Sequence, residues 1–88
     1  MKIEYTGTFL HQVKKIRDRS VKDMIDSAVL SVKKAAGTRN IPGLIKMEGY
    51  KIHYRIRIGR YRIGVKIEGN LVTFEKFGLR KDFYKTFP

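Results

Sequence analysis

The chain is poor in acidic residues and has no cysteine. Only 8 aspartates and glutamates stand against 20 lysines and arginines in 88 positions. Without cysteine there are no disulfides or thiolate metal sites, which fits a protein of the reducing cytoplasm. The two histidines, His11 and His53, are far apart in the sequence and the acids are scattered, so we predict no metal and no cofactor.

Long apolar stretches are missing as well. No run approaches the length that spans a membrane, and the first residues, MKIEYTGTF, lack the apolar segment of a signal peptide. The length suits one small domain, residues 1–88, with neither linkers nor repeats. We therefore expect a single cytoplasmic domain.

The net charge is the most informative property of the composition. A formal charge of +12 makes the folded protein repel itself, so we expect something outside the fold to use it. Nucleic acid, an acidic protein and an anionic membrane surface are the candidate partners. The plainer alternative is that the charge only keeps the protein soluble.

Two amphipathic helices are predicted in the N-terminal half, after a short strand at KIEY. The first covers residues 8–18 and is capped by Thr8. The second is capped by Ser20 and ends at Gly37. Apolar residues at helical spacing define their inward faces: Phe9, Leu10, Val13 and Ile16 in the first, and Val21, Met24, Ile25, Ala28, Val29, Val32, Ala35 and Ala36 in the second.

Three strands are predicted after a loop over residues 38–49, and they cover residues 50–58, 61–67 and 71–77. Two-residue turns at Gly59-Arg60 and Gly69-Asn70 join them. The fold class is therefore α+β with the order β-α-α-β-β-β. Two helices cover one face of a small antiparallel sheet and the other face stays open.

The first turn fixes which residues of the open face are neighbours. It sets Arg57 opposite Arg62, and Arg55 opposite Gly64, where no side chain fills the space. Like charges directly opposed destabilise a sheet, so three convergent arginines around a shallow concavity indicate a polyanion site. The alternative is that this face is simply solvated and that its charges prevent aggregation at the sheet edge. We favour this alternative for Lys51 and Lys66.

Other residues are expected on or beside this basic face. The second turn assigns Thr73, Glu75 and Phe77 to it, with Glu75 in an ion pair to Arg62 or Lys66, while Val72 and Phe74 face the core. His53 is its only histidine. We expect at most one helical turn in the C-terminal segment LRKDFYKTFP. Its aromatic residues Tyr84 and Phe87 either stack on a nucleobase or dock on the sheet, and we prefer docking for Phe87.

Two segments, IPGLIKMEGYKIHYRIRIGRYRIGVKI and VTFEKFGLRKDFYKTFP, resemble the RelE/ParE superfamily of toxins from type II toxin–antitoxin pairs. The resemblance implies two helices on a curved antiparallel sheet. RelE-like members are ribosome-dependent, metal-independent mRNA endoribonucleases that inhibit translation. ParE-like members inhibit DNA gyrase. A cognate antitoxin silences both kinds, and the basic surface predicts that the antitoxin here is acidic.

The resemblance also assigns roles to residues. The family's catalytic positions fall on Arg55, Arg57, Arg62, Arg80 and Tyr84. We expect RNA contacts from Lys51, His53, Lys66 and Lys81. The chain departs from its relatives at Leu79, where histidine is frequent, and at Arg60, where an acid is frequent. Leu79 leaves Tyr84 as the main candidate for proton transfer.

We therefore predict a RelE-like toxin that cuts ribosome-bound mRNA, with the ribosome, mRNA and an antitoxin as partners. Two alternatives stay open. One is a ParE-like gyrase inhibitor, and the retained set of arginines argues against it. The other is a nucleic-acid-binding protein with little catalytic activity, and Leu79 is its best support.

Overall fold

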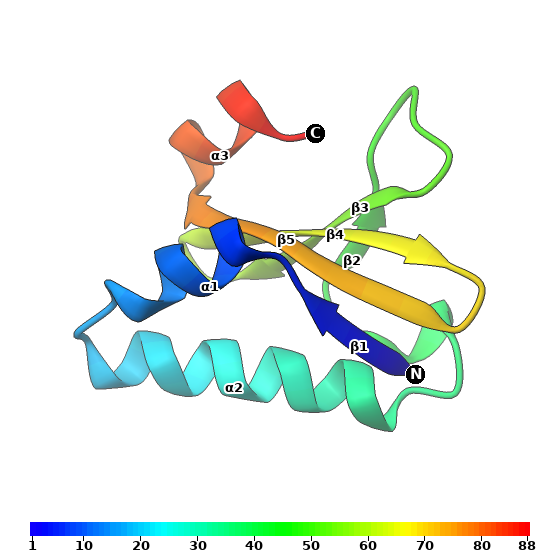
Figure 1. Cartoon of the computed structure of the whole chain (residues 1–88), viewed down its shortest axis with the longest axis horizontal. Helices are drawn as coiled ribbons and strands as arrows, with labels where there is room; N and C mark the ends of the chain where they lie inside the picture. Colours follow the sequence, from blue (N-terminus) through cyan, green and yellow to red (C-terminus); the bar gives the residue numbers. More distant parts are fainter.

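A five-stranded sheet separates two layers of helix in the computed structural model, which describes residues 1–88 (Figure 1). The strand order is β1-β5-β4-β3-β2. The strands are β1 (Lys2–Tyr5), β2 (Leu44–Lys46), β3 (His53–Ile58), β4 (Tyr61–Glu68) and β5 (Leu71–Leu79). The helices are α1 (Gly7–Lys14), α2 (Arg19–Lys34), α3 (Arg80–Thr86) and the 3-10 turn η1 (Thr38–Asn40).

Both N-terminal helices begin earlier than expected, because a different side chain caps each. The Thr6 hydroxyl accepts from the backbone N–H of Phe9 at 3.1 Å, and Asp18 accepts from that of Ser20 at 2.8 Å. Thr8 and Ser20 therefore lie inside the helices, and the caps predicted at these positions were wrong. Gly37 does not cap α2 either, since that helix already ends in an extended residue, Ala35.

The apolar core lies between the two N-terminal helices and one face of the sheet. The predicted stripe of α2 is confirmed from Val21 to Ala35, whereas Ala36 is exposed. In α1, Phe9 is buried and packs on Phe74 of β5, with ring centroids 5.4 Å apart. Leu10 was expected to face inward but is 53% exposed, because α1 offers only a narrow buried face.

The register that the first turn predicted is confirmed. Ile58 pairs with Tyr61, Arg57 with Arg62, and Arg55 with Gly64. The predicted strand over residues 50–58 begins only at His53, and part of the predicted loop forms β2, which pairs with β3.

The sheet is mixed rather than purely antiparallel. β1 runs parallel to β5. The two helices carry the chain from β1 to β2 on the opposite edge of the sheet, and three antiparallel steps then bring β5 beside β1. Local alternation of side chains carries no information about the direction of an edge strand, so this feature was not predicted.

A β-bulge in β5 overturns part of the predicted face assignment. Gly64 pairs with Lys76 but Val65 pairs with Phe74, so Glu75 is an extra residue in the strand. Beyond the bulge the faces exchange. Phe77 therefore lies in the core, 4% exposed and stacked on Tyr61, rather than on the basic face.

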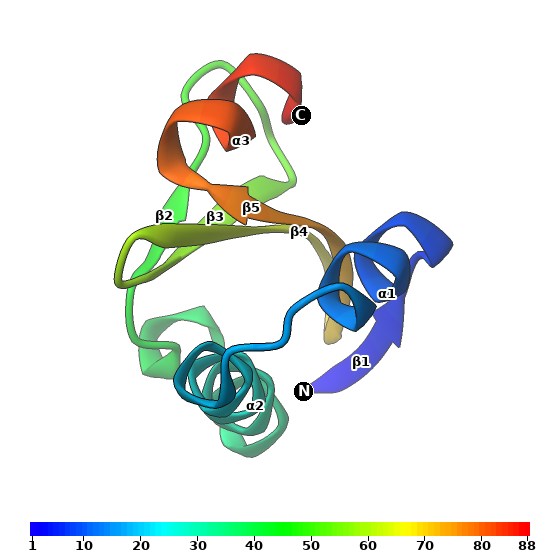
Figure 2. The ribbon, with the colours of Figure 1, turned by 90° about the vertical axis from the view of Figure 1, so that its left-hand side faces the viewer.

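The face that was expected to be open carries α3. Figure 2 shows α3 on one side of the sheet and α2 on the other. The C-terminal segment forms seven helical residues rather than a single turn, and it buries Phe83 and Phe87 against the sheet. The basic side chains of β3 and β4 thus lie partly beneath a helix.

Candidate functional site

Arg62 lies at the centre of the basic face and is only 6% exposed. Its Nη1 donates to the carbonyl oxygens of Gly59 and Tyr61, at 3.0 and 2.8 Å. Its Nε is buried and has no hydrogen-bond partner. Arg62 forms no ion pair, because the carboxylates of this face pair elsewhere.

Arg55 repeats this situation on the neighbouring strand. Its side chain is half-buried, and its Nη1 is buried without a partner. Arg57, opposite Arg62, is exposed. Two guanidinium groups therefore keep unused, desolvated donors on the same face of the sheet. An anion that accepted hydrogen bonds from these donors would offset part of the cost of desolvating the two cations.

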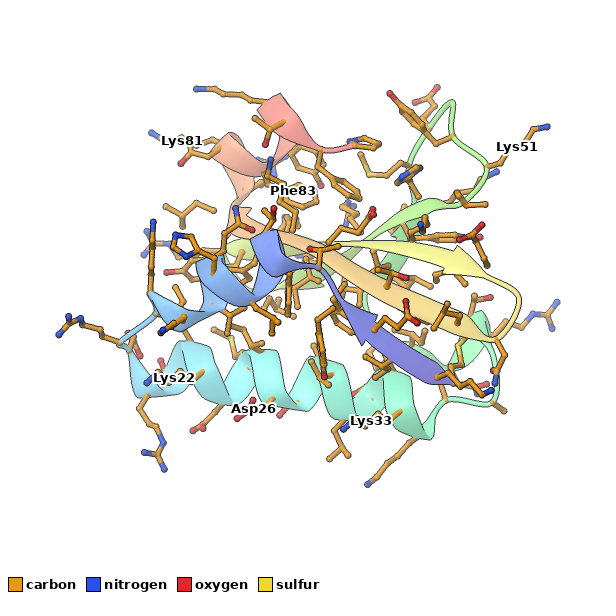
Figure 3. The ribbon with its side chains drawn as sticks, viewed as in Figure 1. Lys22, Asp26, Lys33, Lys51, Lys81 and Phe83 are labelled. Atoms are coloured by element: carbon orange, nitrogen blue, oxygen red, sulfur yellow. The ribbon has the colours of Figure 1, made fainter.

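The predicted concavity opposite Arg55 is filled. A Cβ atom at Gly64 would lie 2.6 Å from a ring carbon of Phe87, so the aromatic ring packs directly on the glycine backbone. Phe83 packs beside Phe87, with centroids 5.0 Å apart, and points from α3 toward the sheet (Figure 3). The predicted docking of Phe87 on the sheet is confirmed. The prediction of an empty concavity opposite Arg55 was wrong.

The other residues assigned to catalysis lie on α3. Arg80 is exposed at the start of the helix, where its backbone N–H donates to the Arg60 carbonyl oxygen at 3.0 Å. A pocket of about 310 Å³ is lined by Arg60, Leu79, Arg80 and Lys81. Tyr84 is 40% exposed and forms no hydrogen bond to the sheet arginines. No side-chain hydrogen bond therefore joins Arg80 or Tyr84 to Arg55 or Arg62.

The lysines expected to contact RNA do not form one cluster. Lys51 extends from the loop before β3, whereas Lys81 projects from α3, at the other end of this face (Figure 3). Lys66 is directed to the Glu68 carboxylate, at 3.5 Å. The basic residues are therefore spread over a broad surface rather than concentrated at the arginines.

His53 and Glu75 form a contact that was not predicted. The Nε2 of His53 lies 3.7 Å from Oε1 of Glu75, so the ion pair expected between Glu75 and Arg62 or Lys66 was wrong. The bulge explains the change, since it turns Glu75 and Lys76 together toward the basic face. Two successive polar residues within an alternating strand, opposite a glycine, were a readable signal of this bulge.

Two further observations concern the whole chain. None of the helices has the length and hydrophobicity that crossing a membrane requires. No three histidine, aspartate or glutamate side chains lie together in an arrangement that could hold a metal ion.

Comparison with known proteins finds relatives of one kind, although no family model matches the chain. The sequence is 44% identical over 43 residues to Toxin RelE3 of Methanocaldococcus jannaschii. The match spans 49% of this chain and 49% of that protein, so it covers about half of the curated relative.

Solved structures match over nearly the full length. The RelB-RelE antitoxin-toxin complex from Methanococcus jannaschii matches with a TM-score of 0.80, at 26% identity, over 97% of this chain and 99% of the other. The intact E. coli RelBE toxin-antitoxin complex matches with a TM-score of 0.71, at 15% identity, over 89% and 94%. The YoeB dimer from Staphylococcus aureus gives 0.70, at 14% identity, over 86% and 92%.

The last two structures are too distant in sequence to show more than a common fold. The two M. jannaschii proteins add similarity of sequence to similarity of fold. In sequence and in fold together, the chain is similar to toxins of the RelE kind.

Proposed function

We propose that this protein is the toxin of a type II toxin–antitoxin system and that it cleaves mRNA on the ribosome. The observation that carries the proposal is the pair of desolvated guanidinium groups, Arg55 and Arg62, with unused donors and no carboxylate partner. Planar, forked donors of this kind match the oxygens of a phosphate group. The toxin relatives in sequence and fold support the same conclusion.

The reaction is attack of a ribose 2′-oxygen on the adjacent phosphorus, with negative charge growing on the phosphate oxygens. The two carbonyl contacts of Arg62 hold its guanidinium in a fixed orientation. A donor that is fixed before the reaction is worth about 3–4 kcal/mol of transition-state stabilisation. Arg62 is therefore the catalytic cation, and Arg55 and Arg57 flank it on the sheet.

Access to Arg62 requires a movement of α3. Phe87 packs on Gly64, the cross-strand partner of Arg55, and Phe83 packs beside it, so we expect the phosphate to reach the arginines when these rings leave the sheet. The exposed groups of α3, Arg80 and Tyr84, then close over the substrate from the other side. The ribosome aligns the 2′-oxygen for attack, because a site that has no pocket for a nucleobase cannot position the RNA by itself.

An acidic antitoxin is the proposed partner that silences the protein. Two of the structural relatives were solved as complexes of a toxin with its antitoxin. A charge of +12 attracts a negatively charged chain and accelerates its association. Ribosomes and mRNA place the action of the toxin in the cytoplasm.

The variant Arg62→Lys tests the assignment, because it keeps the charge but loses the planar fork. Single-turnover cleavage of ribosome-bound mRNA should fall by about 100-fold or more, while affinity for the ribosome stays within about twofold. Arg60→Ala is the control, because it removes an exposed cation from a turn. Thermal melting of both variants will establish whether they are folded.

Equal and small effects of the two variants would reduce the arginines to a general phosphate-binding surface. Induction of the protein in cells gives a second test. New mRNA ends within reading frames support the proposal. Intact mRNA together with double-strand DNA breaks would assign the protein to gyrase inhibition instead.

A further inference from the structure

The His53–Glu75 contact lies in a polar pocket that the arginines do not share. The pocket has a volume of about 370 Å³, and its lining includes Thr6, Thr8 and Lys76. The side chains of His53 and Glu75 are each 26% exposed, so both are partly desolvated yet reachable from solvent. This pocket is open to solvent, whereas the surface at Gly64 is covered by Phe87.

Two aromatic rings hold the imidazole in place. Tyr50 meets the His53 ring edge-on at a centroid distance of 5.6 Å, and Phe87 does so at 5.8 Å. Glu75 lies at the Nε2 atom, although several cations of this face were available to pair with it. Two rings and a carboxylate thus restrict the orientation of the imidazole, which favours proton transfer in a defined direction.

His53 is also adjacent to the arginine site. It precedes Arg55 by two residues on β3, so the two side chains leave the same face of the sheet. The Phe87 ring touches His53 and covers Gly64, the cross-strand partner of Arg55. When Phe87 leaves the sheet, the imidazole and the unpaired guanidinium donor therefore border one continuous surface.

The cleavage reaction needs a base that this chain must supply from few candidates. Arginine is protonated at any accessible pH, and a tyrosine with an ordinary pKa near 10 is a weak base at neutrality. Imidazole is the side chain that exchanges protons most readily near neutral pH.

We propose that His53 is the general base of the cleavage reaction and that Glu75 is its positioning residue. His53 removes the proton of the 2′-hydroxyl, the 2′-oxygen forms a bond to phosphorus, and the bond from phosphorus to the 5′-oxygen breaks. The leaving 5′-oxygen takes a proton from solvent. The products are a 2′,3′-cyclic phosphate and a 5′-hydroxyl. This inference rests on the proposed function and names a further catalytic residue within it.

The surroundings of His53 define what a pH profile will report. Charged and titratable groups face it from every strand that packs against it: Glu75 and Lys76 of β5, Lys66 of β4, Arg55 of β3 and Tyr50 of the preceding loop. The same pocket is lined by Thr6 and Thr8, which are uncharged, and the ring of Phe87 packs on the imidazole. Glu75 is the carboxylate paired with His53, so the pH profile of Glu75→Gln must be measured together with those of the His53 variants.

The test is single-turnover cleavage of ribosome-bound mRNA from about pH 5 to pH 9. His53→Gln should lower the rate by about 100-fold or more, in line with the loss of a general base, with unchanged ribosome affinity. The fall in rate at acid pH that a histidine base produces should vanish. His11→Gln is the matched control, because it changes an exposed histidine on α1.

Added imidazole gives a readout that a structural role would not move. It should restore part of the activity of His53→Ala and none of the activity of Arg62→Lys. Glu75→Gln should slow cleavage by about tenfold without weakening ribosome binding, whereas Glu4→Gln, on the exposed face of β1, should have no effect.

The failures of the two proposals are distinguishable. If the wild-type protein cleaves and His53→Gln behaves like His11→Gln, the assignment of His53 is overturned and the endoribonuclease function stands. If the wild-type protein cleaves no mRNA on the ribosome, both proposals are overturned together.

Discussion

The packing of Phe87 on Gly64 makes the substitution Gly64→Ala unusually informative. The new Cβ atom would lie 2.6–2.7 Å from three carbon atoms of the ring, whereas carbon atoms in contact prefer about 3.5–4.0 Å. The backbone angle φ of Gly64 is not positive, so alanine is acceptable to the strand itself. The whole effect therefore comes from the ring, which must move by about 1 Å or more.

The expected cost follows from two opposing contributions. Overfilling a packed site costs about 1–3 kcal/mol. Replacing glycine by alanine recovers about 0.4–1 kcal/mol, because the unfolded chain loses conformational freedom. We therefore expect a net loss of about 0–2.6 kcal/mol in the free energy of unfolding, and thus about 1–3 kcal/mol relative to a glycine-to-alanine change without a clash. The melting temperature should fall by about 4–8 °C for each kcal/mol of net loss.

Urea unfolding followed by circular dichroism measures this loss, with Gly78→Ala as the matched control. Gly78 lies on the neighbouring strand β5, and a Cβ atom added there would have no other heavy atom within 4 Å. The control should be neutral or slightly stabilising. In the double variant with Phe87→Ala, the cost of Gly64→Ala should disappear, because the clashing ring is gone.

Equal stability of the two glycine variants, within about 0.5 kcal/mol, would refute the reasoning. It would mean that Phe87 does not rest on Gly64 in solution and that α3 is not held over the arginines. Access to Arg62 would then need no movement of the helix.

Two further outcomes are expected from charges on the surface. The hydroxyl of Ser20, together with the backbone N–H groups of Ser20 and Val21, lowers the pKa of Asp18. A pKa that is lower in the folded state stabilises the protein above the unfolded pKa, and this stabilisation is lost as pH falls below about 4. In Asp18→Asn, the urea midpoint should therefore depend less on pH in that range than it does in the wild type, as urea unfolding at several pH values will measure. Antitoxin binding, measured by calorimetry, should weaken steeply between about 0.1 and 1 M salt, where the Debye length falls from about 10 to about 3 Å, and a constant affinity would contradict the electrostatic account.

The sequence by itself determined the features that depend on neighbouring residues. The stripe of α2 and the register between β3 and β4 follow from side-chain periods of 3.6 and 2. A two-residue turn then brings Arg57 opposite Arg62 without help from the rest of the fold. The resemblance to RelE-like toxins was likewise visible in the sequence, from motifs carried by these same strands.

The tertiary structure decided what surrounds the arginines. The cover over Gly64, opposite Arg55, depends on Phe87 at the end of α3, and the surface on which this ring packs exists only after the sheet has formed. The His53–Glu75 contact depends on the bulge, which shifts one strand against another by a residue and changes every face beyond it. Both features join segments more than 20 residues apart, and no local pattern of side chains encodes such pairings.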